Sequence, residues 1–124
     1  MTSRPLVSVI DDDQSIRESL PDLIRELGFD AVAFASAEAF LASEAVVRSR
    51  CLVVDIAMPG MTGFDLQNEL MRRSIRIPIV FITAREDEAV RARARAAQGL
   101  GAVDCLTKPF SEAALVEALD AALQ

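Results

Sequence analysis

The sequence predicts an α/β fold in which helices cover both faces of a five-stranded parallel sheet. Five short apolar runs, rich in β-branched residues, alternate along the 124 residues with stretches of helical apolar periodicity. The runs are apolar at nearly every position, which is typical of strands buried on both faces. A chain of this length can bury its own core without metal or disulfide, so we expect one domain over residues 1–124.

The first strand is expected at residues 5–10, PLVSVI. A helix should follow over residues 14–27, where apolar residues recur at helical spacing and Gly28 closes the last turn. Pro21 lies inside this helix, where it removes one backbone hydrogen bond and disfavours helical geometry at the preceding residue. We therefore expect a kink or local loosening at Pro21.

The other elements follow from the same periodicities and from capping residues. Strands are expected at residues 31–34, 51–55, 77–84 and 102–107. Helices are expected at residues 37–45 after the N-cap Ser36, from about 64 to 73, at 86–98, and after the N-cap Ser111. Pro and Gly make residues 58–63, MPGMTG, a loop.

Right-handed crossovers leave few arrangements of five such units, and the natural one is the doubly wound, flavodoxin-like strand order 2-1-3-4-5. Its ligand crevice lies at the carboxyl ends of strands 1 and 3. Asp11 and Asp12 follow strand 1 and Asp55 ends strand 3, so this fold brings the three carboxylates together. The order also separates Cys51 from Cys105 by one strand, roughly 10 Å, so both thiols should stay reduced.

Three converging carboxylates suit Mg²⁺, which prefers oxygen ligands and keeps several of its waters. An alternative stays open for Asp11, Asp12 and Asp13 taken alone, because acidic residues also cap and complement helix N-termini. Asp13, next to the expected helix start, fits that alternative best.

Two further strand ends carry polar side chains: Thr83 follows an apolar run, and Lys108 follows the last strand. Each alone is more often an ordinary strand residue or a solvated charge. Together with the carboxylates they form a set typical of phosphoryl transfer, in which lysine and metal neutralise charge, a hydroxyl donates to a phosphoryl oxygen, and a carboxylate attacks.

This set resembles the signature of the response-regulator receiver domain of bacterial two-component signalling, the CheY-like family, over essentially the whole chain. The matching residues are Asp11-Asp12, DIAMPGMTG from Asp55, Thr83-Ala84 and Lys108-Pro109-Phe110. GAVD at residues 101–104 is further similar to the nitrogen-fixation regulator (FixJ-like) branch.

The resemblance implies a phosphorylation-activated switch, in which Asp55 accepts a phosphoryl group from a histidine kinase in a Mg²⁺-dependent reaction. It implies Asp12 as a direct magnesium ligand, Asp11 as a water-mediated one, and Asp55 and the backbone carbonyl of Ala57 as further ligands.

The resemblance also implies that Thr83 and Lys108 contact the phosphoryl group. The expected partners are a sensor histidine kinase and an output domain or effector protein, with homodimer formation on phosphorylation as an option. In the family the hydroxyl residue that corresponds to Thr83 works as a switch together with an aromatic residue on the fifth strand. The position of that aromatic residue is Cys105 in this chain.

Two other departures concern docking and output. The segment between Thr83 and Lys108 is longer than the family pattern, which indicates an extended helix or longer loop. Its Arg91, Arg93 and Arg95 form either a solvated face or a partner surface. Pro21 interrupts the first helix, which is part of the surface where family members meet their kinase.

Composition removes several function classes. The chain has no histidine, which excludes Ser-His-Asp and Cys-His catalysis and imidazole-bound zinc. Its formal net charge of −6 argues against non-specific binding of nucleic acid or of anionic membranes. No apolar run approaches a membrane span and no signal peptide is evident, so the expected location is the cytoplasm.

Two alternatives to the switch remain open. One is a magnesium-dependent phosphohydrolase acting through an aspartyl-phosphate. Such enzymes usually carry an acid two residues after the nucleophile, where this chain has Ala57. The other is a degenerate receiver that works as an unphosphorylated adaptor, against which the complete set of site residues argues.

Overall fold

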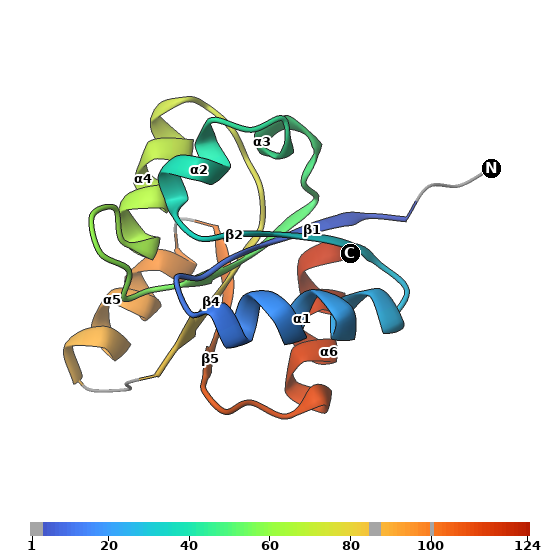
Figure 1. The fold of residues 1–124 in the computed structure, drawn as a ribbon. Helices are drawn as coiled ribbons and strands as arrows, with labels where there is room; N and C mark the ends of the chain where they lie inside the picture. The colour runs from blue at the N-terminus through green and yellow to red at the C-terminus, as the bar shows by residue number, and fades with distance from the viewer. Residues whose placement is uncertain (1–3, 85–87, 100) are drawn as a thin grey trace.

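The structure is a computed structural model that describes residues 4–84, 88–99 and 101–124. Five parallel strands form one sheet in the order β2-β1-β3-β4-β5, which confirms the predicted topology (Figure 1). The strands are β1 (Leu6–Ile10), β2 (Asp30–Phe34), β3 (Cys51–Asp55), β4 (Ile79–Thr83) and β5 (Ala102–Thr107).

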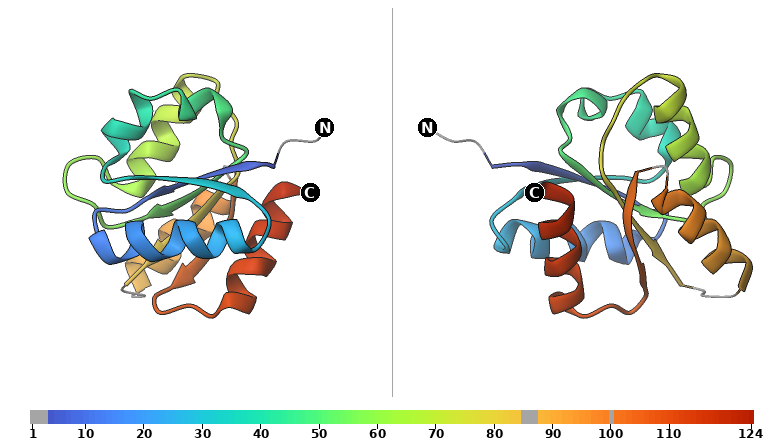
Figure 2. Two further views of the ribbon diagram at one scale, coloured as in Figure 1. Left: turned by 45° about the vertical axis from the view of Figure 1, so that its right-hand side comes forward. Right: turned by 180° about the vertical axis from the view of Figure 1, so that it is seen from behind.

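Helices cover both faces of this sheet. They are α1 (Gln14–Glu26), α2 (Ala37–Leu41), α3 (Ala45–Arg48), α4 (Gly63–Arg72), α5 (Glu88–Gln98) and α6 (Glu112–Leu123). Figure 2 shows α1 and α6 side by side on one face, and α2 to α5 on the other. The first two residues of the helix expected at 86–98 lie outside the described residues.

Alternation along the central strands builds two cores from one sheet. On β4, Ile79 and Phe81 pack under α2, α4 and α5, whereas Val80 and Ile82 pack under α1 and α6. Residues 51–54 on β3 divide in the same way, and the side chains of both central strands are buried. The near-continuous apolar runs are thus explained by burial on both faces.

The helix expected over residues 37–45 is two short helices instead, so this prediction is wrong. Ser43 separates them: its hydroxyl donates to the carbonyl oxygen of Phe40 and accepts from the amide of Ala45. A serine that bonds the local backbone in this way competes with continued helix. The predicted caps are confirmed, because the side chains of Ser36, Asp13 and Ser111 each accept from a first-turn amide.

Helix α1 runs without a break through Pro21, which is buried. The helix ends as predicted at Gly28, whose φ of +103° suits glycine. The Gly28 amide donates to the Arg25 carbonyl, and the Phe29 amide donates to the Ile24 carbonyl, the pattern of a Schellman motif.

Strand β4 lies between β3 and β5, so Cys51 and Cys105 are on strands that do not touch. Both cysteines are free thiols in the structure. None of the helices in the described ranges is long and apolar enough to cross a membrane.

Gly63 fixes the distance between the end of β3 and the start of α4. A Cβ atom at this position would lie 2.8 Å from the carbonyl oxygen of Asp55 and 3.2 Å from the ring of Phe81. The Gly63 amide donates to the carbonyl of Ile56 over 3.0 Å, which closes the loop between them. Only glycine lets the helix start lie this close to the strand end that carries Asp55.

Gly63→Ala should therefore destabilise the fold by about 1–3 kcal/mol through overpacking, although alanine is the better helix former. Urea unfolding followed by far-UV circular dichroism measures the change. Gly99→Ala is the matched control, because its added Cβ would meet only the Ala96 carbonyl oxygen at 3.4 Å. Equal stability of the two variants would contradict the role assigned to Gly63.

Candidate functional site

Four strand ends meet at the carboxyl edge of the sheet and carry the predicted site residues. Asp11 directly follows β1, and its amide donates to the carbonyl of Phe34 at the end of β2. Asp55 and Thr83 are the last residues of β3 and β4. Lys108 directly follows β5, and its amide donates to the Thr83 carbonyl over 2.7 Å. The strand ends are thus tied together by backbone hydrogen bonds.

The ammonium of Lys108 lies between two buried carboxylates. Its Nζ donates to Asp11 Oδ2 over 2.8 Å and lies 3.6 Å from Asp55 Oδ2. Asp11 is fully buried and Asp55 is 5% exposed, while the Lys108 side chain is 16% exposed. Carboxylates this buried are costly unless they are paired and hydrogen-bonded, and both conditions hold here.

The second oxygen of each carboxylate is held by the backbone. The Asp13 amide donates to Asp11 Oδ1 over 2.9 Å, and the Ala57 amide donates to Asp55 Oδ1 over 3.2 Å. Each aspartate therefore has one oxygen anchored to its own loop and the other directed toward Lys108. No buried side-chain oxygen or nitrogen of the described residues lacks a hydrogen-bond partner.

Burial first, and then the charge of Asp11, raises the pKa of Asp55 to about 6, against the opposing effects of Lys108 and the Ala57 amide. For Lys108, burial alone would lower the pKa. The hydrogen bond and charge of Asp11, with the charge of Asp55, outweigh burial and leave the pKa of Lys108 raised. The site thus holds a permanent cation beside a carboxylate that resists ionisation.

Three carboxylates come together at this edge of the sheet. One carboxylate oxygen from each of Asp11, Asp12 and Asp55 lies within 4.8 Å of the other two. Two of these residues are buried and Asp12 is exposed, so the cluster opens to solvent on the Asp12 side. An all-oxygen set that leaves room for water fits Mg²⁺ in ligand type. Ala57, two residues after Asp55, is exposed at the same loop.

The remaining predicted residues lie around this cluster. Thr83 is only 1% exposed, one residue beyond the Asp55 partner Ile82 on β4. Cys105 is half-buried on β5 opposite Phe81 and packs under α5. Asp13 is not part of the cluster, since its side chain caps α1, as the capping alternative predicted.

Sequence reasoning missed two features of the site. One is the Asp11–Lys108 hydrogen bond, which joins residues 97 positions apart. The other is an aromatic contact behind Gly63, where the Phe64 ring lies 5.0 Å from the Phe81 ring and Arg93 of α5 lies 4.4 Å from the Phe64 centroid. Phe64 was expected near the start of a helix and Phe81 within a strand, but no sequence pattern paired them with Arg93.

A family model of the response regulator receiver domain matches residues 7–120. The chain belongs to the response-regulator receiver family. It is 43% identical over 123 residues to Nodulation protein W of Bradyrhizobium diazoefficiens, covering 99% of this chain and 53% of that one. It is 38% identical over 117 residues to the transcriptional regulatory protein FixJ of Azorhizobium caulinodans, covering 94% of this chain and 54% of that one.

Among solved structures, the response regulator StyR superposes with a TM-score of 0.88 at 44% identity, covering 98% of this chain and 60% of that one. With 53% of Nodulation protein W and 54% of FixJ covered, this chain spans about half the length of the curated relatives it matches. The resemblance to the receiver family and to its FixJ-like branch is confirmed. The relatives are signalling regulators, and a receiver of this family carries an acidic pocket of the kind that generally binds Mg²⁺.

The raised pKa of Asp55 makes the metal-free receiver sensitive to pH. The folded carboxyl, with a pKa of about 6, binds more protons than the unfolded one, whose ordinary pKa is about 3.9. Its contribution to stability is therefore lost as pH rises from about 4 to about 6.

Asp55→Asn should thus raise the free energy of unfolding in EDTA on the order of 1–2 kcal/mol at pH 7, and leave it nearly unchanged at pH 4. Urea unfolding at both pH values tests this. Asp30→Asn is the control, since Asp30 is exposed at the start of β2. If the variant were no more stable than the unmodified receiver at pH 7, burial and the charge of Asp11 would not destabilise the ionised Asp55 carboxylate.

Proposed function

We propose that this chain, as a single receiver domain over residues 1–124, is a switch controlled by phosphorylation of Asp55. The observation that carries the proposal is the Lys108 ammonium between the buried carboxylates of Asp11 and Asp55, at the meeting point of four strand ends. A cation held there stabilises negative charge that arrives at Asp55 without having to reorganise.

In the proposed reaction a carboxylate oxygen of Asp55 attacks the phosphorus of a phosphohistidine on a sensor kinase. The P–O bond to Asp55 forms as the P–N bond breaks, and the imidazole departs with its electron pair and takes up a proton. Lys108, 3.6 Å from Asp55 Oδ2, would pair with a phosphoryl oxygen while keeping its bond to Asp11. Thr83, at the adjacent strand end, supplies a hydroxyl for a second phosphoryl oxygen.

Mg²⁺ would be held by Asp12 directly, by Asp11 through water, and by Asp55 and the Ala57 carbonyl. When bound, the cation neutralises charge on the phosphoryl oxygens and on the crowded carboxylates. The exposure of Asp12 leaves one side of the cluster open to a phosphodonor. Because Ala57 offers no side-chain acid, nothing two residues after Asp55 would protonate a leaving group, which favours a switch over a phosphohydrolase.

The proposed partners are a sensor histidine kinase and an output domain or effector, in the cytoplasm, with homodimer formation on phosphorylation as one mode of output. The relatives support this, since FixJ is named as a transcriptional regulatory protein and StyR as a response regulator. This receiver covers 54% of the FixJ chain and 60% of the StyR chain, so each relative has further residues outside the shared segment.

Two side-chain contacts and the small size of Cys105 support α5 as the element that responds. Thr83 is two residues along β4 from Phe81, whose ring packs on Phe64 at the start of α4. Arg93 of α5 lies over the Phe64 ring, 4.4 Å from its centroid. Cys105 is small and half-buried opposite Phe81, so moving it would change little buried apolar area. A movement of β5 would therefore contribute little free energy to the switch.

Acetyl phosphate with Mg²⁺ should add one phosphoryl group at Asp55. Asp55→Asn keeps the shape but loses the nucleophile, so intact-protein mass spectrometry should find no adduct. Asp13→Asn is the control, because asparagine caps helices as well as aspartate and should label normally. Equal labelling of the Asp55 variant would refute the assignment, and steady turnover of p-nitrophenyl phosphate would favour the phosphohydrolase.

Asp12→Ala should weaken Mg²⁺ binding at least roughly tenfold, since even indirect partners of a metal contribute that much, and should slow phosphorylation in step. Calorimetry is the appropriate measurement, because the chain contains neither Trp nor Tyr for fluorescence quenching. Asp13→Asn should bind as the unmodified receiver does. Unchanged affinity in Asp12→Ala would place the metal elsewhere.

Beryllofluoride with Mg²⁺, a stand-in for the phosphoryl group, should alter amide hydrogen exchange at Thr83 and in α5 more than in β5. Cys105→Tyr restores an aromatic side chain at this position and should shift part of the response to β5. Changes confined to the carboxylate pocket, with α5 unaffected, would show that the contacts through Phe64 and Arg93 do not transmit the signal.

A further inference from the structure

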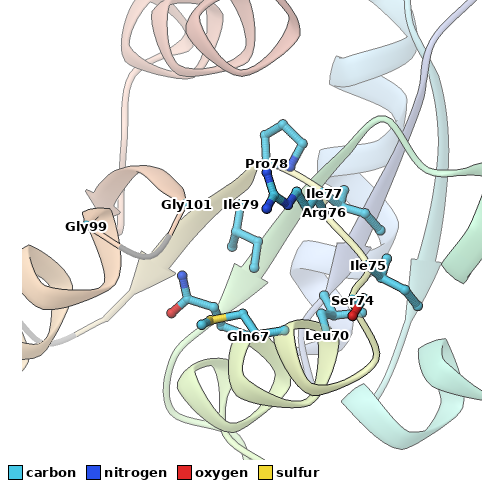
Figure 3. Close-up of a pocket in the computed structure, with 11 residues that line it drawn as sticks. Gln67, Leu70, Ser74, Ile75, Arg76, Ile77, Pro78, Ile79, Gly99 and Gly101 are labelled. Atoms are coloured by element: carbon cyan, nitrogen blue, oxygen red, sulfur yellow. The ribbon is translucent and has the colours of Figure 1, made fainter.

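A groove lies at the amino end of β4, at the edge of the sheet opposite Asp55 (Figure 3). Its volume is about 660 Å³, within the range of ligand sites in proteins. One wall is the last turns of α4 and the loop that follows, and the other is the turn between α5 and β5 at Gly99 and Gly101. None of the residues assigned to phosphorylation lines it.

Six of the eleven residues that line this groove have apolar side chains. The apolar side chains that line it are Leu70, Met71, Ile75, Ile77, Pro78 and Ile79. Met71 is 46% exposed and is one of three large apolar side chains that the described residues leave in water. Covering such a surface is favourable in proportion to its apolar area.

Gln67 supplies a polar group inside the groove. It is only 4% exposed, and its side chain points from α4 toward the turn at Gly99 (Figure 3). Its Nε2 donates to the Ala97 carbonyl over 3.1 Å, while its Oε1 accepts from none of the described residues. Since no described buried side-chain oxygen is without a partner, this oxygen is accessible from the groove and is available to an N–H donor.

The charge around the groove is opposite to that of the whole chain. Arg76 lines it, and Arg76 and Pro78 also line a smaller hollow of about 220 Å³ that includes Arg50. Arg50 and Arg76 are exposed and have no ion-pair partner among the described residues, and nearby Arg72 and Arg73 share one carboxylate, Glu69. A basic edge on a chain of net charge −6 favours an acidic ligand.

We propose that this groove binds an extended, acidic peptide segment of a partner protein. The apolar side chains of the segment would cover the exposed Met71 and the half-buried Ile75 and Ile77, and its carboxylates would pair with Arg76 and Arg50. A backbone N–H of the segment would donate to Gln67 Oε1. Main-chain hydrogen bonding with alternate side chains in pockets is a known way to recognise an extended segment.

A synthetic eight-residue peptide of alternating Glu and Leu, with blocked ends, is the probe. Titrated into ¹⁵N-labelled receiver, it should shift the amide signals of residues 67–79, Gly99 and Gly101 and leave those around Asp55 in place. A peptide of alternating Lys and Leu, with equal apolar content and opposite charge, should not bind. Asp55→Asn should bind the acidic peptide like the unmodified receiver, so failure of the groove and failure of the phosphorylation site are distinguishable.

Arg76→Glu should weaken the acidic peptide about fivefold or more, as expected for an exposed ion pair of about 1 kcal/mol that is lost and reversed. Met71→Gln, at an exposed apolar position, should weaken it as well. Arg95→Glu is the matched control, since Arg95 is exposed on α5 away from the groove. The proposal would be overturned if Arg76→Glu bound the acidic peptide as tightly as the unmodified receiver does, or if the Lys-Leu peptide bound as tightly as the Glu-Leu peptide. It would also be overturned if the fatty acid dodecanoate shifted the same signals and bound more tightly than the acidic peptide.

Discussion

The ion pair between Lys108 and the buried Asp11 is the interaction on which the site depends. Asp11 has no exposure to water, and Asp55 is nearly as buried. Without the ammonium 2.8 Å from Asp11 and 3.6 Å from Asp55, the two carboxylates would face each other in a low-dielectric setting. The pair also joins the ends of β1 and β5, the first and last strands in sequence. One contact therefore both positions the charges of the site and holds the strand ends together at this edge.

The backbone around this pair is as constrained as the charges. Each aspartate has one oxygen held by an amide of its own loop, from Asp13 or Ala57. The Asp55 loop is in turn held by α4, whose first residue, Gly63, approaches the Asp55 carbonyl too closely for any side chain. Preorganised dipoles and charges of this kind act on a reacting group without further rearrangement. A shift of α4 would therefore move the backbone at Asp55.

Periodicity, capping residues and the few allowed crossovers were together sufficient to predict the sheet order, the two-faced burial and the caps at Asp13, Ser36 and Ser111. The convergence of Asp11, Asp12, Asp55 and Lys108 followed from that topology. The break at Ser43 was missed because a serine inside an apolar pattern carries no signal of which backbone groups it will bond. The Arg93–Phe64 contact and the Asp11–Lys108 distance depend on side-chain positions in space, which spacing alone does not fix.

The two edges of the sheet carry opposite charge, and this separates what each can bind. Acidic residues gather at the carboxyl ends of the strands around Asp11, Asp12 and Asp55, a surface suited to a cation and a phosphoryl group. Arginines gather at the amino ends of β3 and β4, around Arg50 and Arg76. Helices α4 and α5 reach from one edge to the other, with Phe64 and Arg93 in contact along the way and Gln67 bonded to the Ala97 carbonyl near the groove. A change in how α5 packs on α4 would therefore alter both edges at once, although they share no residue.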